Sequence, residues 1–153
     1  MKLLLEINNQ TLYKFPKKIF TDVFAWTIEK AAMKCLAEKN LELSIAIVSE
    51  VEIHTLNKQY RKKDKPTDVL SFCEFSDKDE FCACIDEKIF LGELILCPAY
   101  IEKNAKEDGE SLEFAISYIT SHGILHLLGF DHGKKMFSLQ NEVAQKSINN
   151  NLI

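Results

Sequence analysis

The sequence lacks the features of a membrane-spanning or secreted protein. No stretch approaches the roughly 20 consecutive apolar residues that a bilayer-spanning helix needs. The apolar run that follows Met1 ends at Glu6, far too early for a signal peptide. The five cysteines are odd in number and irregularly spaced, which fits free thiols in a reducing compartment better than a disulfide framework. We therefore expect a cytoplasmic protein that does not enter a membrane.

Positive charge is also scarce. The 19 lysine and arginine residues are outnumbered by 23 aspartate and glutamate residues, and the net charge of −4 argues against a general nucleic-acid coat. A phosphate-binding function therefore needs a local concentration of positive charge. The clearest one contains the chain's one arginine and three lysines: Arg61, Lys62, Lys63 and Lys65. Arginine offers a planar fork of donors for bidentate phosphate contact, whereas the lysines alone fit a solvated basic loop.

Only four histidines occur in the chain, yet three of them fall in the stretch 122–132, His-Gly-Ile-Leu-His-Leu-Leu-Gly-Phe-Asp-His. His122 and His126 are one helical turn apart, so both imidazoles leave the same face of a helix. Gly129 favours the left-handed conformation that ends a helix, and the chain can then bring His132 back. Three converging imidazoles make a zinc site with an open fourth position, the catalytic pattern. The simpler alternative is three unrelated histidines.

The spacing of these histidines is that of a metzincin protease except at one residue. Those enzymes carry Glu after the first histidine as the general base, whereas Gly123 has no side chain to accept a proton. Glycine inside a helix is about 1 kcal/mol less favourable than alanine, so either tight packing or room for a ligand should favour it here. A peptidase or other small-substrate zinc hydrolase is therefore a disfavoured alternative.

A second motif is Arg-Lys-Lys-Asp-Lys-Pro-Thr-Asp-Val-Leu-Ser-Phe over residues 61–72, and a third is Leu-Gly-Glu-Leu over residues 91–94. Together with the histidine motif, they make the chain from residue 43 onward similar to the YbeY family of zinc-dependent endoribonucleases, also described as rRNA maturation factors. The chain departs from the usual family pattern at two positions, where the family has Asp at Glu93 and Tyr at Phe130.

The resemblance implies a single-strand-specific endoribonuclease that acts in rRNA processing, including 3′-end maturation of the small-subunit rRNA, and in ribosome quality control. It implies one zinc ion per chain, bound by His122, His126 and His132, with RNA and ribosomal subunit or assembly proteins as partners. It also places a functional arginine at Arg61, which with His122 is our candidate catalytic residue. The other alternative is a non-catalytic ribosome-assembly factor with structural zinc, for which Cys73 or Glu93 could supply a fourth ligand.

The candidate residues suit phosphodiester hydrolysis. Zinc lowers the pKa of its bound water toward about 7, so no base is needed beside the first histidine, and Arg61 can share the neutralisation of transition-state charge. Attack by the 2′-hydroxyl of the RNA itself is an alternative. Asp68, Glu93 and Asp131 are candidates to orient the ligand imidazoles. Asp68 and Asp131 fit a purely local role in turns equally well.

Alternating and helical apolar patterns predict the order of the elements. Strands are expected at 2–7, 41–48, 69–75 and 89–96, and helices at 16–39, 49–60, 98–108, 111–128 and 134–147. The third and fourth strands should form an antiparallel hairpin. With no repeat or linker, we expect one YbeY-like metallohydrolase domain over 1–153. It should have an α+β fold, with a mixed four-stranded sheet, about five helices and the histidine helix at its centre.

Some residues are expected to have no chemical role. The acidic stretch 76–88 should be a mobile loop, in which Cys82 and Cys84 are a loop feature rather than a metal site. His54 should be a surface histidine, because it lies one residue off the apolar positions of its helix. Trp26 lies beside the apolar stripe of the first helix, and we expect it to pack rather than to stack on a base.

Overall fold

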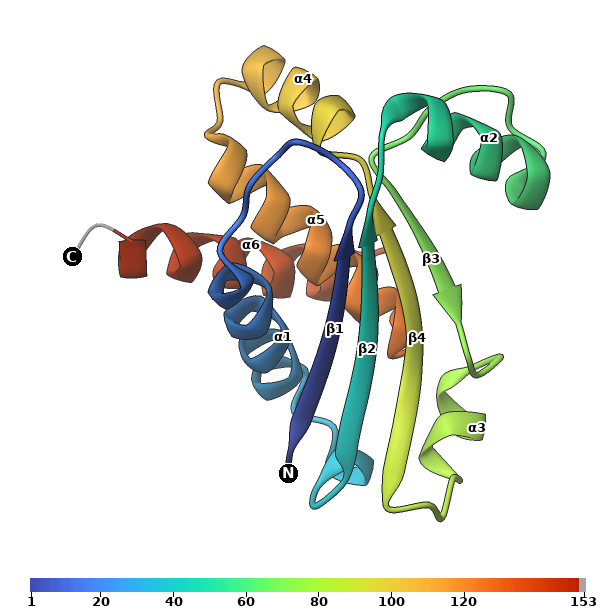
Figure 1. Ribbon diagram of the computed structural model, residues 1–153. Coiled ribbons are helices and arrows are strands. Elements are labelled where there is room, and N and C mark those ends of the chain that lie inside the picture. The colour runs from blue at the N-terminus through green and yellow to red at the C-terminus, as the bar shows by residue number, and fades with distance from the viewer. Residues whose placement is uncertain (152–153) are drawn as a thin grey trace.

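The computed structural model describes residues 1–151 as one four-stranded sheet with helices on both faces (Figure 1). The strands are β1 (Leu3–Asn9), β2 (Asn40–Ile47), β3 (Val69–Cys73) and β4 (Lys88–Leu96). The helices are α1 (Lys17–Ala31), the 3₁₀ helix η1 (Lys34–Leu36), α2 (Glu50–Arg61), α3 (Lys78–Cys82), α4 (Pro98–Asp108), α5 (Leu112–Leu127) and α6 (Lys134–Asn151). The expected α+β fold is confirmed, with six α-helices in the described residues rather than about five.

The sheet is mixed, as its sequence pattern indicated. Its order is β1-β2-β4-β3, in which β1, β2 and β4 run parallel and β3 pairs antiparallel with β4 at the edge. Every second residue of β2 is buried, because one face of this strand packs against a helical layer. That layer consists of α1, α5 and α6, which pack against one another on the same side of the sheet (Figure 1).

A smaller apolar cluster lies on the opposite face, under α2. Ile53 of this helix is fully buried, and it belongs to a cluster with Leu70 of β3 and Ile95 of β4. The helix begins as its sequence predicts, because the Ser49 hydroxyl accepts a hydrogen bond of 3.2 Å from the backbone N–H of Glu52. It ends at Arg61, from which the chain returns to the outer edge of the sheet as β3.

The histidine helix α5 is central, as expected. Ile116, Ile124 and Leu125 are fully buried. Two of its buried hydroxyls are paired across the helical layer, since Ser121 shares a hydrogen bond of 2.8 Å with Thr27 of α1 and Ser117 donates one of 2.9 Å to a serine of α6. A helix held from both sides in this way gives its polar face a fixed position. The buried hydroxyl of Thr120 has no partner in the described residues.

Two helix ends differ most from the sequence prediction. α1 ends at Ala31 rather than near residue 39, because Ala32 takes a left-handed conformation with φ 49° and η1 then leads into β2. The apolar pattern continues past this break because Leu36 of η1 is also buried. α6 continues to Asn151, four residues beyond its expected end at Ser147.

The stretch 76–88 is not the wholly irregular loop that its composition indicated. It contains α3, whose first turn is capped by Asp77, which accepts a hydrogen bond of 2.8 Å from the Glu80 backbone N–H. Phe81 of this helix is 1% exposed and belongs to the main core. The burial of this single aromatic side chain orders a segment that is otherwise acidic and polar.

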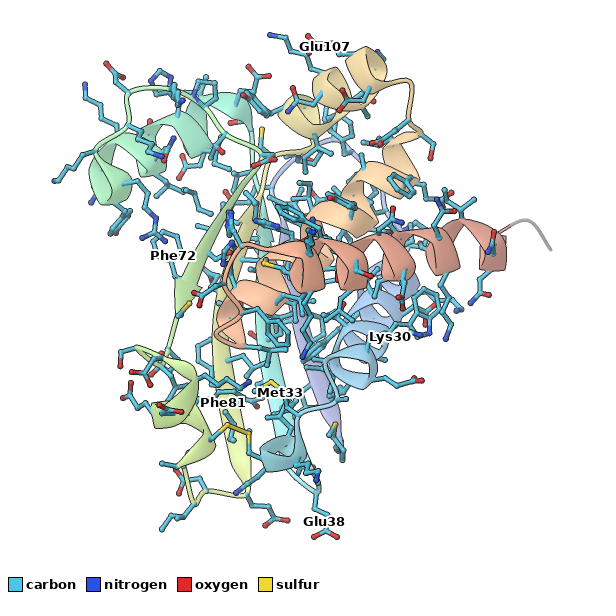
Figure 2. All side chains as sticks on the ribbon, turned by 180° about the vertical axis from the view of Figure 1, so that it is seen from behind. Lys30, Met33, Glu38, Phe72, Phe81 and Glu107 are labelled. Carbon is cyan, nitrogen blue, oxygen red and sulfur yellow. A yellow bond between two sulfur atoms is a disulfide. The ribbon has the colours of Figure 1, made fainter. Side chains whose placement is uncertain are left out.

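The expectation of free thiols is wrong for one pair of cysteines. Cys35 of η1 and Cys82 of α3 are joined by a disulfide, with Cα atoms 5.4 Å apart (Figure 2). Cys73, Cys84 and Cys97 are free. The two bonded residues are 47 positions apart, so no local pattern could have paired them.

The minor expectations are met. His54 is a partly exposed surface residue whose Nε2 lies 2.7 Å from an Asp64 carboxylate oxygen. Trp26 packs against the main core, with the Lys146 ammonium over its ring. None of the helices in residues 1–151 combines the length and apolar character needed to cross a bilayer.

Candidate metal centre

The turn after α5 brings the third histidine back to the first two. Gly129 has φ 86°, a left-handed conformation that side-chain-bearing residues rarely adopt. Its N–H donates to the carbonyl of His126, and the N–H of Phe130 donates to the carbonyl of Leu125, both over 3.0 Å. This pair of bonds is a Schellman motif, which satisfies the last carbonyls of the helix. The chain reverses there and places His132 opposite the helix end.

Gly129 is also required by close packing. A Cβ atom at this position would lie 2.8 Å from the Cβ of Lys78 and 3.1 Å from its backbone nitrogen. The start of α3 therefore lies directly against the turn that positions His132. The segment 76–88 is thus part of the support of the candidate site, which its sequence did not indicate.

The three histidines converge on one point. The Nε2 atom of His126 lies 3.1 Å from Nε2 of His122 and 2.7 Å from Nε2 of His132. All three ligand atoms lie within 4.8 Å of one another. Three imidazole nitrogens facing one another without intervening side chains are a tridentate donor set. The three histidines predicted as ligands are therefore positioned to hold a metal ion.

A buried glutamine orients the first of these histidines. Gln140 of α6 is 1% exposed, and its Oε1 lies 3.1 Å from Nδ1 of His122. Because an amide oxygen can only accept, Nδ1 carries the proton and Nε2 presents its lone pair to the centre. No pattern in the sequence indicated this residue. The one feature that could have pointed to it is that a polar amide side chain occurs among the buried apolar residues Met136, Val143 and Ala144 of α6.

The protonation of the ring nitrogens also suits metal binding. Burial lowers the pKa of His122, an effect opposed by the hydrogen bond that His122 donates to Gln140 and strengthened by His132. Burial, His122 and His132 together lower the pKa of His126 to about 4. Both rings are therefore neutral at neutral pH, which is the form that coordinates a metal.

Gly123 serves packing rather than the metal. A Cβ atom there would lie 2.7 Å from Cδ2 of Leu94 and 3.4 Å from the hydroxyl oxygen of Ser71. The missing side chain thus faces the sheet, and α5 approaches β4 closely because position 123 is glycine. Of the two explanations that the sequence allowed, tight packing is the one that the structure supports.

The histidines line a cleft of about 370 Å³ at the edge of the sheet. Its other wall contains Arg61, Asp68 and residues of β3, including Ser71 and Cys73. The Arg61 guanidinium donates to the Ser71 carbonyl over 2.5 Å, and its Cζ lies 5.3 Å from the ring centre of Phe72. The structure thus places the chain's one arginine and the three histidines on a common cleft.

The three candidate carboxylates are placed differently from one another. Asp68 lines the cleft, but its Oδ1 accepts from Thr67 and from the Val69 N–H, so it stabilises the turn into β3.

Glu93 neighbours Leu94 on β4 and therefore faces the opposite side of the sheet, where it accepts from Ser44. Its expected role in orienting a ligand imidazole is wrong. The exposed Asp131 acts electrostatically, opposing the lowering of the His126 pKa.

No fourth protein ligand joins the three histidines within the described residues 1–151. Cys73 lines the cleft, but its sulfur lies 3.8 Å from the His126 carbonyl oxygen. Burial raises the pKa of this thiol, and Arg61 opposes the shift. Three donors with an open side suit a catalytic metal better than a structural one.

Comparison with known proteins gives the chain its family. The family model described as Endoribonuclease YbeY matches residues 6–151. The chain belongs to this family. An Endoribonuclease YbeY of Aquifex aeolicus is 41% identical over 146 residues, which cover 90% of this chain and 91% of the relative. The YbeY of Lactobacillus acidophilus is 38% identical over 118 residues, covering 71% and 68% of the two chains.

A solved structure shares the fold. The solution structure of TM1509 from Thermotoga maritima superposes with a TM-score of 0.63 at 28% identity. The match covers 96% of this chain and 91% of the Thermotoga chain. The YbeY resemblance that the motifs at 61–72, 91–94 and 122–132 indicated is thereby confirmed over nearly the whole length.

Proposed function

We propose that this chain is a zinc-dependent endoribonuclease that cleaves single-stranded RNA, with one zinc ion bound by His122, His126 and His132. Its proposed substrate is rRNA, including the 3′ end of the small-subunit rRNA, and its proposed partners are ribosomal subunit or assembly proteins in the cytoplasm. Membership of the endoribonuclease family supports the reaction class.

One observation carries the proposal. The three Nε2 atoms and the Arg61 side chain line the same open cleft. The cleft thus offers metal-binding nitrogens together with a guanidinium suited to phosphate oxygens. A peptidase site would need a general base beside the metal, and position 123 has none.

The residues of the cleft divide the proposed work. A zinc ion held there would supply Lewis acidity and lower the pKa of a water molecule at neutral pH. Gln140 fixes the tautomer of His122 through Nδ1 and so keeps its Nε2 directed at the centre. Arg61 is held beside the cleft by Ser71 and Phe72, where its remaining N–H groups can bind phosphate oxygens and stabilise the charge that develops on them.

The test is cleavage of a structured rRNA fragment by zinc-loaded protein and by the same protein with excess chelator. We expect cleavage in single-stranded regions, loss with chelator and recovery when zinc is restored. Casein and a simple ester are tested in parallel. Cleavage of casein but not RNA would replace the proposal by a peptidase, and tight zinc binding without any hydrolysis would replace it by an assembly factor.

A further inference from the structure

An exposed phenylalanine stands beside the third histidine. Phe137 lies in the first turn of α6 and is 46% exposed. Its ring centre lies 6.2 Å from that of His132, and the two planes are inclined by 71°. Met136, the preceding residue, is 1% exposed and anchors the helix in the core. Phe137 therefore points away from the core, at the rim of the candidate metal centre.

Two lysines lie over the ring of Phe130, in the turn that carries His132. The ammonium groups of Lys78 and Lys135 each lie 5.6 Å from the ring centre of Phe130. Lys134 and Lys135 open α6, and its first turn carries no acidic residue. The beginning of α6 lies toward β3 (Figure 2). In a chain of net charge −4, the lysines at the start of α6 supply cations next to this rim, where Asp131 is the adjacent carboxylate.

Two other hollows of the molecule carry more carboxylates. The cavity of about 270 Å³ between α4 and α5 is lined by Asp108, Glu110 and Asp68, the last of which also lines the histidine cleft. Phe90, another exposed phenylalanine, lines a hollow on the far face of the sheet together with Glu6 and Glu42. Carboxylates in these places repel a phosphate backbone. Phe137 differs from Phe90 because it lies beside the histidine centre, on a helix that begins with two lysines.

Proteins that bind single-stranded nucleic acid commonly combine exposed aromatic rings with positively charged side chains. The unpaired bases of the nucleic acid stack on exposed aromatic rings, while lysines follow the backbone phosphates. A base within a duplex has both faces covered by its neighbours, so it cannot use such a ring. An aromatic platform next to the reacting phosphate would therefore favour unpaired RNA.

We propose that Phe137 is a base-stacking platform for a nucleotide next to the phosphodiester at the histidine centre. Lys78 and Lys135 contact backbone phosphates on the same side, and Arg61 contacts phosphate on the opposite wall of the cleft. Phe137 is a positioning residue, because it touches the base and not the reacting atoms. The inference rests on the proposed ribonuclease function and adds to it a binding subsite for single-stranded RNA.

The test measures binding apart from cleavage. A fluorescent single-stranded RNA is titrated by anisotropy into chelated protein, and quenching of 2-aminopurine in the same RNA reports stacking. We expect Phe137→Ala to weaken binding by about 5- to 150-fold and to lose the quenching. Phe137→Trp should keep both, whereas Phe137→Leu, which is apolar without an aromatic face, should behave like Phe137→Ala.

Phe90→Ala is the matched control, since it removes another exposed phenylalanine on the face lined by carboxylates. It should bind RNA like the parent. Thermal unfolding of all variants should stay near that of the parent, because both side chains are largely outside the core. In zinc-loaded protein, Phe137→Ala should raise KM for single-stranded RNA more than it lowers kcat.

Two results would count against the inference in different ways. If the parent binds RNA and Phe137→Ala or Phe137→Leu binds equally well, the stacking platform is wrong and the proposed function is untouched. If the parent neither binds nor cleaves RNA, the proposed function fails and this inference falls with it.

Discussion

Nδ1 of His122 and Oε1 of Gln140 lie 3.1 Å apart and join α5 to α6 through a buried hydrogen bond. Partners of this kind fix the orientation and tautomer of a ligand histidine, and their loss typically reduces metal affinity by about 10- to 100-fold. Gln140 therefore connects the packing of the helical layer to the chemistry of the cleft.

We expect Gln140→Leu to weaken zinc binding by about 10- to 100-fold with little loss of folding, because leucine fills a similar volume in an apolar environment. Competition with a zinc-sensitive dye measures the affinity. Gln145→Leu is the control, since Gln145 is exposed on the same helix. Equal affinities for the Gln140 and Gln145 variants would show that the hydrogen bond does not support the centre.

Removal of a proposed ligand should remove the metal. Purified protein is expected to carry about one zinc per chain, since three imidazoles with an open position form one site. His126→Ala should lose it and unfold at a temperature near that of the chelated parent, because metal binding stabilises the folded state. Elemental analysis after gel filtration gives the content. His54→Ala, at the surface pair with Asp64, should retain zinc, and full occupancy in His126→Ala would rule out the site.

Arg61→Lys tests the guanidinium fork. Lysine keeps the positive charge but cannot hold Ser71, Phe72 and a phosphate at once. We expect kcat for RNA cleavage to fall by about 100-fold, as for loss of one transition-state donor, with zinc content and thermal unfolding unchanged. Lys62→Ala and Lys63→Ala should instead weaken RNA binding modestly and reduce its salt dependence. Parent-like cleavage by Arg61→Lys would leave the arginine without its proposed role.

The turn that positions His132 can be tested through two glycines. Gly109 has φ 69° and open space where a Cβ would be, so Gly109→Ala should show only the conformational cost of about 1–2 kcal/mol. Gly129→Ala adds the clash with Lys78, so its free energy of unfolding should fall further. Chemical denaturation measures both. Zinc affinity should fall in Gly129→Ala alone. If both variants bind zinc with the same affinity, the turn at Gly129 does not position a metal ligand.

The metal-binding residues could be predicted because their geometry is local. The spacing of His122 and His126 on one helix, with Gly129 after it, specifies the approach of His132 within a few residues. The strands of the sheet could be predicted equally well, since the alternation of apolar and polar residues in 41–48 reflects the burial of one face of the strand. These elements required no knowledge of distant contacts.

What the sequence did not indicate depends on packing between distant segments. Gln140 meets His122 because α5 and α6 lie side by side, and no spacing rule links them. The segment 76–88 is ordered by the burial of Phe81 and by its disulfide to Cys35, although its composition is that of a loop. Glu93 faced away from the metal because strand alternation places it opposite Leu94, which packs on Gly123.

The two walls of the cleft come from parts of the chain that are far apart in the sequence. The histidines and Gln140 come from the single stretch 122–140, whose ends meet through the pairing of α5 and α6. Arg61 reaches the cleft from a remote part of the chain, and only through β3, an edge strand that pairs with one neighbour. Short loops close at low entropic cost, while long ones form contacts late in folding. The metal-binding wall is therefore closed by contacts that are local in the sequence. The arginine wall meets it through the pairing of the edge strand β3 with β4, so the complete site depends on that edge being in place.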